Sequence, residues 1–317
     1  MTATFRLPEK DRARGLMAGL LLGDALGRED AEVPGLLHGT SLAQLACFTV
    51  EGLVRASVRA AHKGTCHPAE VVWHAYHRWG AIQRVVPHAG RPYAGGSTFW
   101  PDGWLHQVAP LAVARGATAA TTAALRAGVR GTPGHPVGTA ADAHALTRTL
   151  PAALFASTMS DAGQLARELA VLTHGAPAAR ETAATGTVLV ARALQEDTLD
   201  AVLGDAPAPP GGLRGTAAAA LAHGLAAARA HPAPDEVLAA IAAAGATGGA
   251  GAATCVGTLL GALHGYRALP QPLLARLEIG WVADRLAIDA VVEQSFHPSR
   301  SSSATGDGSW YARYPGW

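Results

Sequence analysis

The sequence predicts a mostly or wholly α-helical fold, and three observations support this class. Leucine and alanine recur at helical spacing, glycine and proline separate these segments, and alternating strands with hairpin turns are not evident. With 317 residues, the chain has enough material to bury a large core. The segments that we expect to be helical are 11–27, 40–61, 68–79, 104–114, 117–129, 140–157, 161–173, 178–195, 211–231, 234–244, 252–266 and 271–293.

The first predicted helix contains RGLMAGLLLGDALGRED and has a glycine at every fourth position from Gly15 to Gly27. Each glycine inside a helix costs roughly 1 kcal/mol relative to alanine. A strip without side chains allows a neighbouring helix to approach closely, and this packing offsets the cost. Asp24 lies at the end of the strip, where a carboxylate needs a partner. That partner is expected to be a hydrogen-bond donor of the chain, a metal ion or a polar substrate.

Helix boundaries can be assigned for the next two segments. Thr40 or Ser41 is a suitable N-cap for the helix over 40–61. A Lys-Gly stop ends that helix, and Pro68 begins the next one. These signals explain the intervening HKGTCHP better than a zinc site, because one cysteine and two histidines at this spacing match no closed zinc pattern.

Three stretches read as irregular. Residues 84–103 are rich in glycine, proline and aromatics and indicate a long loop, and 203–213 indicate a flexible connector. We expect a helical domain over 1–297 and a Ser/Gly-rich tail over 298–317. The tail is expected to be disordered, or to dock its aromatic end on the body or on a neighbouring subunit of a homo-oligomer. Those aromatic residues are Trp310, Tyr311, Tyr314 and Trp317.

Charge and cysteine content narrow the function class. The net charge of +1 does not indicate a nucleic-acid or anionic-membrane partner. We find no apolar run approaching the roughly 20 residues that span a bilayer, and no export signal at the N-terminus. The three cysteines are far apart and odd in number, which indicates a reducing cytoplasm.

Several motifs, in this order, resemble the ADP-ribosylglycohydrolase family. The Gly-Asp-Ala-Leu-Gly of the first helix resembles its N-terminal signature, and LTHGAPAA at 172–179 resembles its Leu-Thr-His-Gly-x-Pro motif. QLACFTVEGLVRA (44–56), HALTRTLPAAL (144–154) and GTLLGALHG (257–265) resemble three further segments. The resemblance covers roughly residues 10 to 290 and implies a compact, all-α orthogonal helical bundle.

Active members of that family cleave the glycosidic bond between ADP-ribose and a modified side chain, using two Mg²⁺ or Mn²⁺ ions held by oxygen ligands. Where the family has Thr-Asp-Asp-Thr, this chain has Thr40, Ser41, Leu42 and Ala43. Where the family has a second acidic stretch, residues 247–257 contain neither aspartate nor glutamate, and Thr254 is the hydroxyl nearest the expected position.

A third family ligand, a glutamate, corresponds to Ala31, although Glu29, Asp30 and Glu32 lie close by. The resemblance therefore implies a divergent member without the family's metal centre, and we expect no cofactor. The family's Gly-Asn-Gly-type loop near the ribose is replaced by Asp142, Ala143 and His144. ADP-ribose is accordingly not expected to bind in the family's usual pose.

Polar side chains near these motifs are candidate catalytic groups. His174 matches the family histidine that lies near the substrate, but it could equally hold the adjacent loop. His144 and Arg148 are spaced i, i+4 and would face together, presenting two cations to a phosphate or carboxylate. Alternatively, Arg148 is buried and paired with an acid such as Asp24.

The loop FWPDGW places Asp102 between Trp100 and Trp104. The two aromatic rings could stack on a base and position the carboxylate as a general acid or base. Equally, the sequence Pro-Asp-Gly is an ordinary turn, with the tryptophans packed on the core. Glu51 either faces the site or pairs with Arg55 one helical turn away.

The glycine-rich TGGAGA at 247–252 could hold a phosphate on backbone N–H groups at a helix N-terminus, although no P-loop lysine follows it. The candidate catalytic groups are therefore Asp102, His144 and His174. The candidate ligand contacts are Asp24, Thr40, Glu51, Trp100, Trp104, Asp142, Arg148, Gly249, Gly251 and Thr254.

Three functions are compatible with these features. The one we favour is a metal-free family member that binds ADP-ribose or a related nucleotide-like molecule. The second is a metal-independent enzyme that reuses the cleft for acid–base chemistry on a small substrate. The third is an interaction or regulatory scaffold.

Overall fold

The computed structural model describes residues 5–6, 8–28, 35–86, 100–116, 118–204, 213–296, 298 and 308–315. Within these residues the protein is a bundle of helices, and the β pairing consists of isolated bridges such as that between Leu37 and Leu277. The α-helices are α1 Lys10–Leu26, α2 Ser41–Lys63, α3 Pro68–Ile82, α4 Ala119–Ala127, α5 His144–Thr147, α6 Met159–Val171, α7 Pro177–Ala193, α8 Leu199–Leu203, α9 Ala217–Ala230, α10 Val237–His264, α11 Gln271–Leu274, α12 Gly280–Phe296 and α13 Gly308–Arg313. The 3₁₀ helices are η1 Leu105–Gln107, η2 Ala109–Ala112, η3 Leu150–Phe155, η4 Pro234–Glu236 and η5 Tyr266–Ala268.

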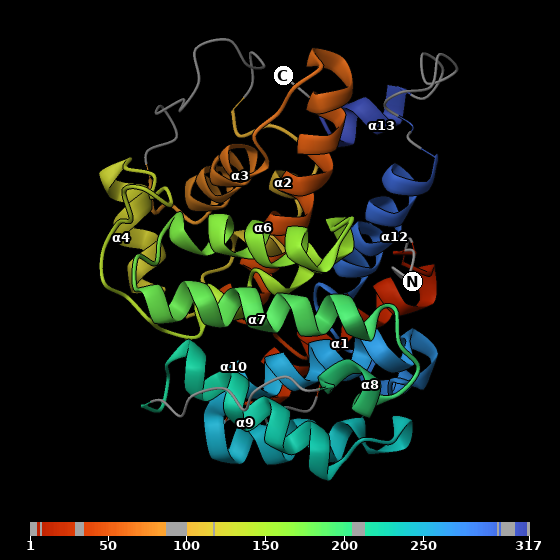
Figure 1. The fold of residues 1–317 in the computed structure, drawn as a ribbon. Coiled ribbons are helices and arrows are strands. Elements are labelled where there is room, and N and C mark those ends of the chain that lie inside the picture. Colours follow the sequence, from red (N-terminus) through yellow and green to blue (C-terminus); the bar gives the residue numbers. More distant parts are fainter. Residues whose placement is uncertain are drawn as a thin grey trace.

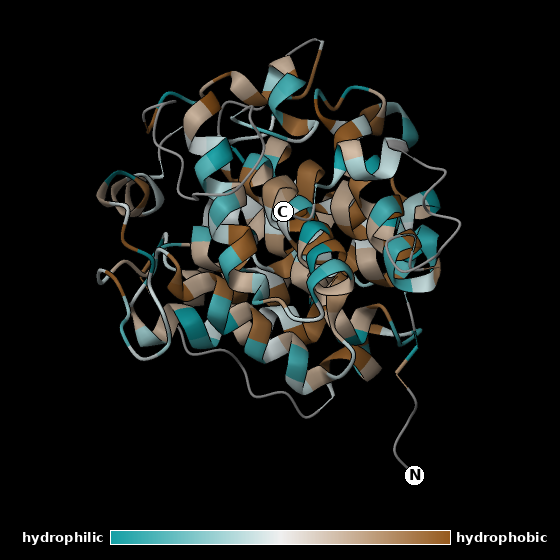
Figure 2. Ribbon diagram, turned by 90° about the horizontal axis from the view of Figure 1, so that it is seen from above, coloured by the Kyte–Doolittle hydropathy of each residue, from teal (hydrophilic) through white to brown (hydrophobic). Residues whose placement is uncertain are grey.

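The helices cross one another in layers. In Figure 1, α6 and α7 lie side by side across the middle of the molecule, α9 and α10 lie below them, and α2 and α12 rise above. The core is formed by leucine, alanine and valine side chains from nearly every helix. In Figure 2, apolar turns gather toward the middle of the bundle, and hydrophilic turns lie more often at its outside. The predicted all-α class is confirmed.

The glycine strip of α1 packs directly on the backbone of α10. A Cβ atom added to Gly19 would overlap the carbonyl oxygen of Gly257, and one added to Gly15 would overlap that of Gly261. The relation is reciprocal, because a Cβ on Gly257 or Gly261 would overlap the backbone of α1. Glycine is therefore required on both helices for this close approach.

Two predicted helices, 234–244 and 252–266, form the single element α10, which bends at Gly249. This glycine has φ 71° and ψ −169°, a conformation outside the helical region. Two other predicted helices are interrupted. The segment 140–157 divides into α5 and η3, and Pro151 near the start of η3 provides no backbone N–H to continue an α-helix. The segment 271–293 divides into α11 and α12, with the bridge of Leu277 between them.

Our expectation that no apolar run approaches membrane-spanning length was wrong. The stretch Pro234–His264, which contains α10, is long and apolar enough by length and composition, with a mean hydropathy of 1.4 in its most apolar window. Alanine, leucine and valine account for much of this apolar character. In that window 39% of the residues are buried. The second half of α10, from Ala252 to Leu263, is fully buried and packs on α1.

The described part of the tail docks on the body as α13 (Figure 1). Trp310 and Tyr314 are buried, and the hydroxyl of Tyr314 donates to Oδ2 of Asp289 at 2.8 Å. Nε of Arg55 donates to the carbonyl oxygen of Pro315 at 2.9 Å. Of the expected outcomes for the tail, docking on the chain's own body is the one observed for these residues; Trp317 lies outside the described residues.

The helix contact predicts that Gly19→Ala will lower the free energy of unfolding by about 1–3 kcal/mol or more, because the added methyl group must force two backbones apart. This loss should appear although alanine is the better helix former. Urea unfolding provides the measurement. The matched control is Gly134→Ala, where an added Cβ meets nothing within 4 Å. Equal stabilities for the two variants would contradict the assigned role of the glycine strip.

Candidate functional site

A cavity of about 290 Å³ lies where five segments of the chain converge. It is bordered by the start of α2, the loop after η2, the start of α5, the loop before α9 and the bend of α10. The lining residues are Thr40, Ser41, Leu42, Arg115, Gly116, Asp142, Ala143, His144, Gly215, Ala250 and Gly251. A neighbouring cavity of about 410 Å³ shares Thr40, Arg115 and Gly116 with it and is also lined by Arg28 and Ala114.

The bend of α10 forms one wall of the cavity. Because Gly249 leaves the helical conformation, Ala250 and Gly251 begin a second helical segment at the cavity. A Cβ atom on Gly251 would lie 2.6 Å from the Cβ of Ala143, so glycine allows the α5 segment to approach. Of the predicted contacts from TGGAGA, Gly251 lines the cavity and Gly249 creates the bend.

Asp24 is fully buried and closes the start of α2. Its Oδ2 accepts from the N–H of Thr40 at 2.5 Å, and its Oδ1 accepts from the hydroxyl of the same residue at 2.8 Å. The Thr40 hydroxyl in turn accepts from the N–H of Leu42, and the N–H of Ser41 donates to the carbonyl of Arg115. Burial raises the pKa of Asp24, although the hydrogen bonds from Thr40 oppose this effect. The predicted N-cap, Thr40, is confirmed.

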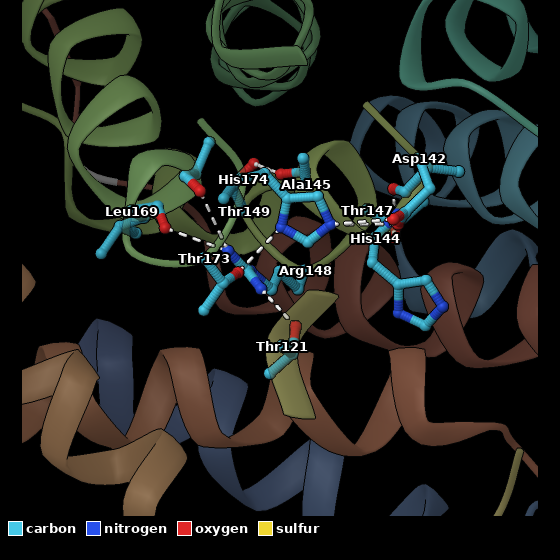
Figure 3. A network of polar contacts seen from close by, with 12 residues as sticks. Thr121, Asp142, His144, Ala145, Thr147, Arg148, Thr149, Leu169, Thr173 and His174 are labelled. Atoms are coloured by element: carbon cyan, nitrogen blue, oxygen red, sulfur yellow. Dashed lines mark hydrogen bonds and ion pairs between the residues drawn. The ribbon is translucent and has the colours of Figure 1, made fainter. Parts of the chain in front are cut away.

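Asp142 and His174 form a pair at another wall of the cavity (Figure 3). Nε2 of His174 lies 3.1 Å from each carboxylate oxygen of Asp142. Nδ1 of His174 lies 2.8 Å from the hydroxyl of Thr173, and the N–H of His144 donates to Asp142 at 3.0 Å. The Asp142 side chain remains 43% exposed, whereas His174 is fully buried.

The electrostatics of this pair favour an ionised aspartate beside a neutral histidine. Burial lowers the pKa of His174, so its neutral form donates from Nε2 and accepts at Nδ1. Burial works to raise the pKa of Asp142, but the hydrogen bond from His174 and the nearby histidines outweigh it, and the pKa lies below its ordinary value. The pair therefore presents a fixed negative charge to the cavity.

The chain of contacts from Thr173 through His174 to Asp142 has the residue types of a hydrolytic triad. A nucleophile must reach the substrate, however, and Thr173 is only 2% exposed. His174 is equally inaccessible. We conclude that His174 positions Asp142, and that Asp142 is the member of the group that a ligand can touch.

Arg148 is fully buried and anchors α5 rather than lining the cavity. One of its terminal nitrogens donates to the hydroxyl of Thr121 at 3.0 Å, and the other to the carbonyl oxygens of Leu169 and Ala170 at 3.2 Å. Figure 3 shows the guanidinium reaching toward these groups, away from the ring of His144. The alternative in which Arg148 pairs with Asp24 is wrong.

His144 lines the cavity beside Asp142, and its Nδ1 is buried without a hydrogen-bond partner in the described part of the chain. Burial lowers its pKa to about 4, partly opposed by the charge of Asp142. The ring is therefore neutral near pH 7.

Asp102 and Glu51 lie in a separate cluster with Arg55 and Arg78. Asp102 accepts from both terminal nitrogens of Arg55, at 3.1 and 2.8 Å. Glu51 accepts from Arg55 at 3.1 Å and from Arg78 at 2.6 Å. Burial acts to raise the pKa of Asp102, but Arg55 and Arg78 outweigh it and lower the pKa. None of the four residues lines the cavity.

The remaining candidates also lie away from the cavity lining. Thr254 is buried and donates its hydroxyl to the carbonyl of Ala250 at 2.7 Å. Trp104 packs on Trp281, with ring centroids 5.9 Å apart. Trp100 is half-buried and precedes the cis bond to Pro101.

Arg115 is a cavity residue that sequence reasoning missed. Its terminal nitrogen donates to Glu278 at 2.7 Å and lies 3.1 Å from Nδ1 of His38. These partners are far apart in sequence, and the surrounding stretch matches no motif, so no local signal marked Arg115.

The comparisons with known proteins agree with this architecture. The sequence model of the ADP-ribosylglycohydrolase family matches residues 6–301, and the chain belongs to that family. A solved structure described as an ADP-ribosylglycohydrolase-related protein complex has the same fold, with a TM-score of 0.56 and 22% sequence identity. The similarity covers 89% of this chain and 97% of that chain. The comparison with curated proteins finds no match.

The buried cluster predicts that Asp102→Asn will lower the free energy of unfolding by about 3 kcal/mol, because it leaves Arg55 and Arg78 with one acid between them. Urea unfolding measures the change, with the exposed Asp235→Asn as the control. A variant that kept full stability but failed to bind ligand would show that Asp102 belongs to the ligand site instead.

The buried ring of His144 predicts a specific dependence of stability on pH. Between its pKa of about 4 in the folded chain and about 6.5 in the unfolded chain, the unfolded state binds the additional proton. The stabilisation that the neutral His144 ring gives the folded chain is complete above pH 6.5. It is lost as the pH falls, and the free energy of unfolding decreases by up to about 3 kcal/mol near pH 4. We expect His144→Gln to flatten the stability profile in this range relative to the parent protein. Parallel profiles would contradict the assignment.

Proposed function

We propose that this chain binds ADP-ribose or a related nucleotide-like small molecule in the cavity, without the dinuclear Mg²⁺ or Mn²⁺ centre of its family. The observation that carries the proposal is the composition of the cavity wall. The cavity lies where the segments corresponding to two of the family's metal-binding stretches, 40–43 and 247–257, come together. Among its lining residues there is one carboxylate, that of Asp142.

The described residues do not fit a pair of hard cations, which prefer several carboxylate oxygens. Apart from Asp142, the cavity side-chain oxygens are the hydroxyls of Thr40 and Ser41, and Thr40 is already bonded to Asp24. Leu42 provides no ligand. No group of three or more His, Cys, Asp or Glu in the described chain is placed to hold a metal ion. Glu29, Asp30 and Glu32 lie outside the described residues.

The lining suits a ligand with hydroxyl groups and a phosphate. The exposed carboxylate of Asp142 can accept hydrogen bonds from sugar hydroxyls. The N–H groups at the start of the second half of α10 can donate to a phosphate oxygen. Arg115, which is paired with Glu278, lies in the same lining. A sugar phosphate or nucleotide combines both kinds of group.

The metal-independent enzyme is the less favoured alternative. An effective acid–base group has a pKa near the working pH. The pKa values of Asp142 and His144 are both below their ordinary values, so both are weak bases near pH 7. His174 is buried behind Asp142, and Asp102 belongs to the ion-pair cluster. Binding therefore suits this site better than proton transfer.

An interaction scaffold that uses the aromatic tail is also less favoured. Trp310 and Tyr314 are buried in the chain's own body, so they are not available to a second subunit while α13 is docked. A homo-oligomer through this tail stays a prediction. We further propose a cytoplasmic location and a small molecule as the partner, with neither nucleic acid nor membrane involved.

Calorimetric titration with ADP-ribose tests the proposal, once with Mg²⁺ and once with EDTA, together with an assay for product. We expect the same affinity in both conditions and no turnover. Asp142→Asn should weaken binding by about tenfold or more, because a hydrogen bond to a charged acceptor contributes about 1.5–3 kcal/mol. The exposed Asp235→Asn controls for the loss of a carboxylate elsewhere.

Binding or turnover that requires Mg²⁺ would show that a metal centre exists and would contradict the proposal. Absence of binding under both conditions would exclude ADP-ribose as the ligand. Equal affinity for the parent protein and Asp142→Asn would remove Asp142 from the site.

A further inference from the structure

Trp281, the second residue of α12, is an exposed tryptophan outside the cavity lining. Its side chain is 58% exposed, although indole is among the largest apolar groups. Trp104 packs against it at 5.9 Å between ring centroids, with the planes tilted by 50°. Trp104 is half-buried, and its Nε1 has no hydrogen-bond partner in the described part of the chain. The two rings therefore pack on each other while more than half of Trp281 stays exposed.

A short chain of contacts connects this aromatic pair to the cavity. Arg115 lines both neighbouring cavities and donates to Glu278 at 2.7 Å. Glu278 precedes Trp281 by three residues, in the turn that leads into α12. Trp281 is thus connected to the cavity lining through one ion pair and a three-residue step along the chain.

Two more apolar residues are exposed on segments connected to this ion pair. Leu36 is 53% exposed and Val113 is 43% exposed. Leu37 forms a bridge to Leu277 with its own side chain buried, so its neighbour Leu36 faces outward. Val113 lies two residues before Arg115. Trp281, Leu36 and Val113 are thus exposed apolar residues on the segments that the Arg115–Glu278 ion pair and the Leu37–Leu277 bridge hold together.

The exposed apolar residues and the cavity differ in chemistry, as the base and the sugar phosphate of a nucleotide do. The cavity lining includes the carboxylate of Asp142 and the start of the second part of α10, which suit hydroxyls and phosphate. Trp281, outside the cavity lining, is an exposed aromatic residue, which suits a planar heterocycle. A ligand that spans both would place its sugar phosphate inside and its base on the indole.

We propose that Trp281, supported by Trp104, is the stacking platform for the base of the nucleotide-like ligand. This inference rests on the proposed function, because it assigns the second half of the same ligand. It replaces the sequence hypothesis in which Trp100 and Trp104 flank the base around Asp102. The carboxylate of Asp102 lies in the ion-pair cluster, and Trp104 has Trp281 as its aromatic partner.

The test compares two ligands, ADP-ribose and ribose 5-phosphate, which lacks the base, on the parent protein and two variants. Stacking of a base contributes about 1–3 kcal/mol, so Trp281→Ala should weaken ADP-ribose binding by about tenfold. Its affinity for ribose 5-phosphate should not change. Trp281→Phe keeps an aromatic face and should retain most of the affinity for ADP-ribose. Phe296→Ala removes another exposed aromatic from α12 and serves as the matched control, with no expected change.

The outcomes separate this inference from the function on which it rests. If Trp281→Ala binds ADP-ribose as tightly as the parent protein does, the platform is wrong and the cavity assignment stands. Equal weakening of both ligands would also contradict stacking, because the base would then make no special contribution. A changed oligomeric state of Trp281→Ala by light scattering, with unchanged affinity, would assign the surface to a second copy of the chain. If neither ligand binds to the parent protein, the proposed function fails, and the platform fails with it.

Discussion

Backbone contact between α1 and α10 is the constraint on which the rest of the structure depends. Glycines on both helices remove the side chains that would keep them apart. Near the end of this contact, Gly23 lies against Ala253, one helical turn beyond the bend at Gly249. Asp24 therefore lies close to the start of the second half of α10, where it accepts two hydrogen bonds from Thr40 and fixes the start of α2. The cavity is a consequence of two helices that meet without side chains between them.

Charged side chains are divided between two places with different tasks. In the cluster of Glu51, Arg55, Arg78 and Asp102, two acids and two bases neutralise one another and hold the segment around Asp102 against α2 and α3. At the cavity, by contrast, Asp142 keeps an exposed face because its histidine partner is neutral. A buried set of balanced charges favours a fixed structure, whereas an unbalanced charge at a cavity wall favours a ligand.

Local patterns predicted much of the fold, and long-range contacts account for most of what they missed. The glycine spacing of α1, the N-cap at Thr40 and the stop after Lys63 depend on nearby residues, and each can be read from the sequence. The bend at Gly249 could not, because glycine tolerates both helical and non-helical conformations and the choice is made by packing. The separation of the acidic residues between the ion-pair cluster and the cavity could not be read from the sequence either. Asp102 reads as a candidate base in its own loop, and only the fold brings Arg55 and Arg78 to it.

The contact between α1 and α10 joins segments that are synthesised far apart in time. About 240 residues separate Gly19 from Gly257, and at about 5–20 residues per second the second helix follows the first by about 10–50 s. During that interval the glycine-rich α1 lacks the surface that offsets its poor helix propensity. The N-terminal segment therefore cannot complete its structure as it leaves the ribosome, and the nascent chain must keep an apolar strip soluble until its partner arrives. The fold depends on the packing of its first long helix, and this packing forms late in the synthesis of the chain.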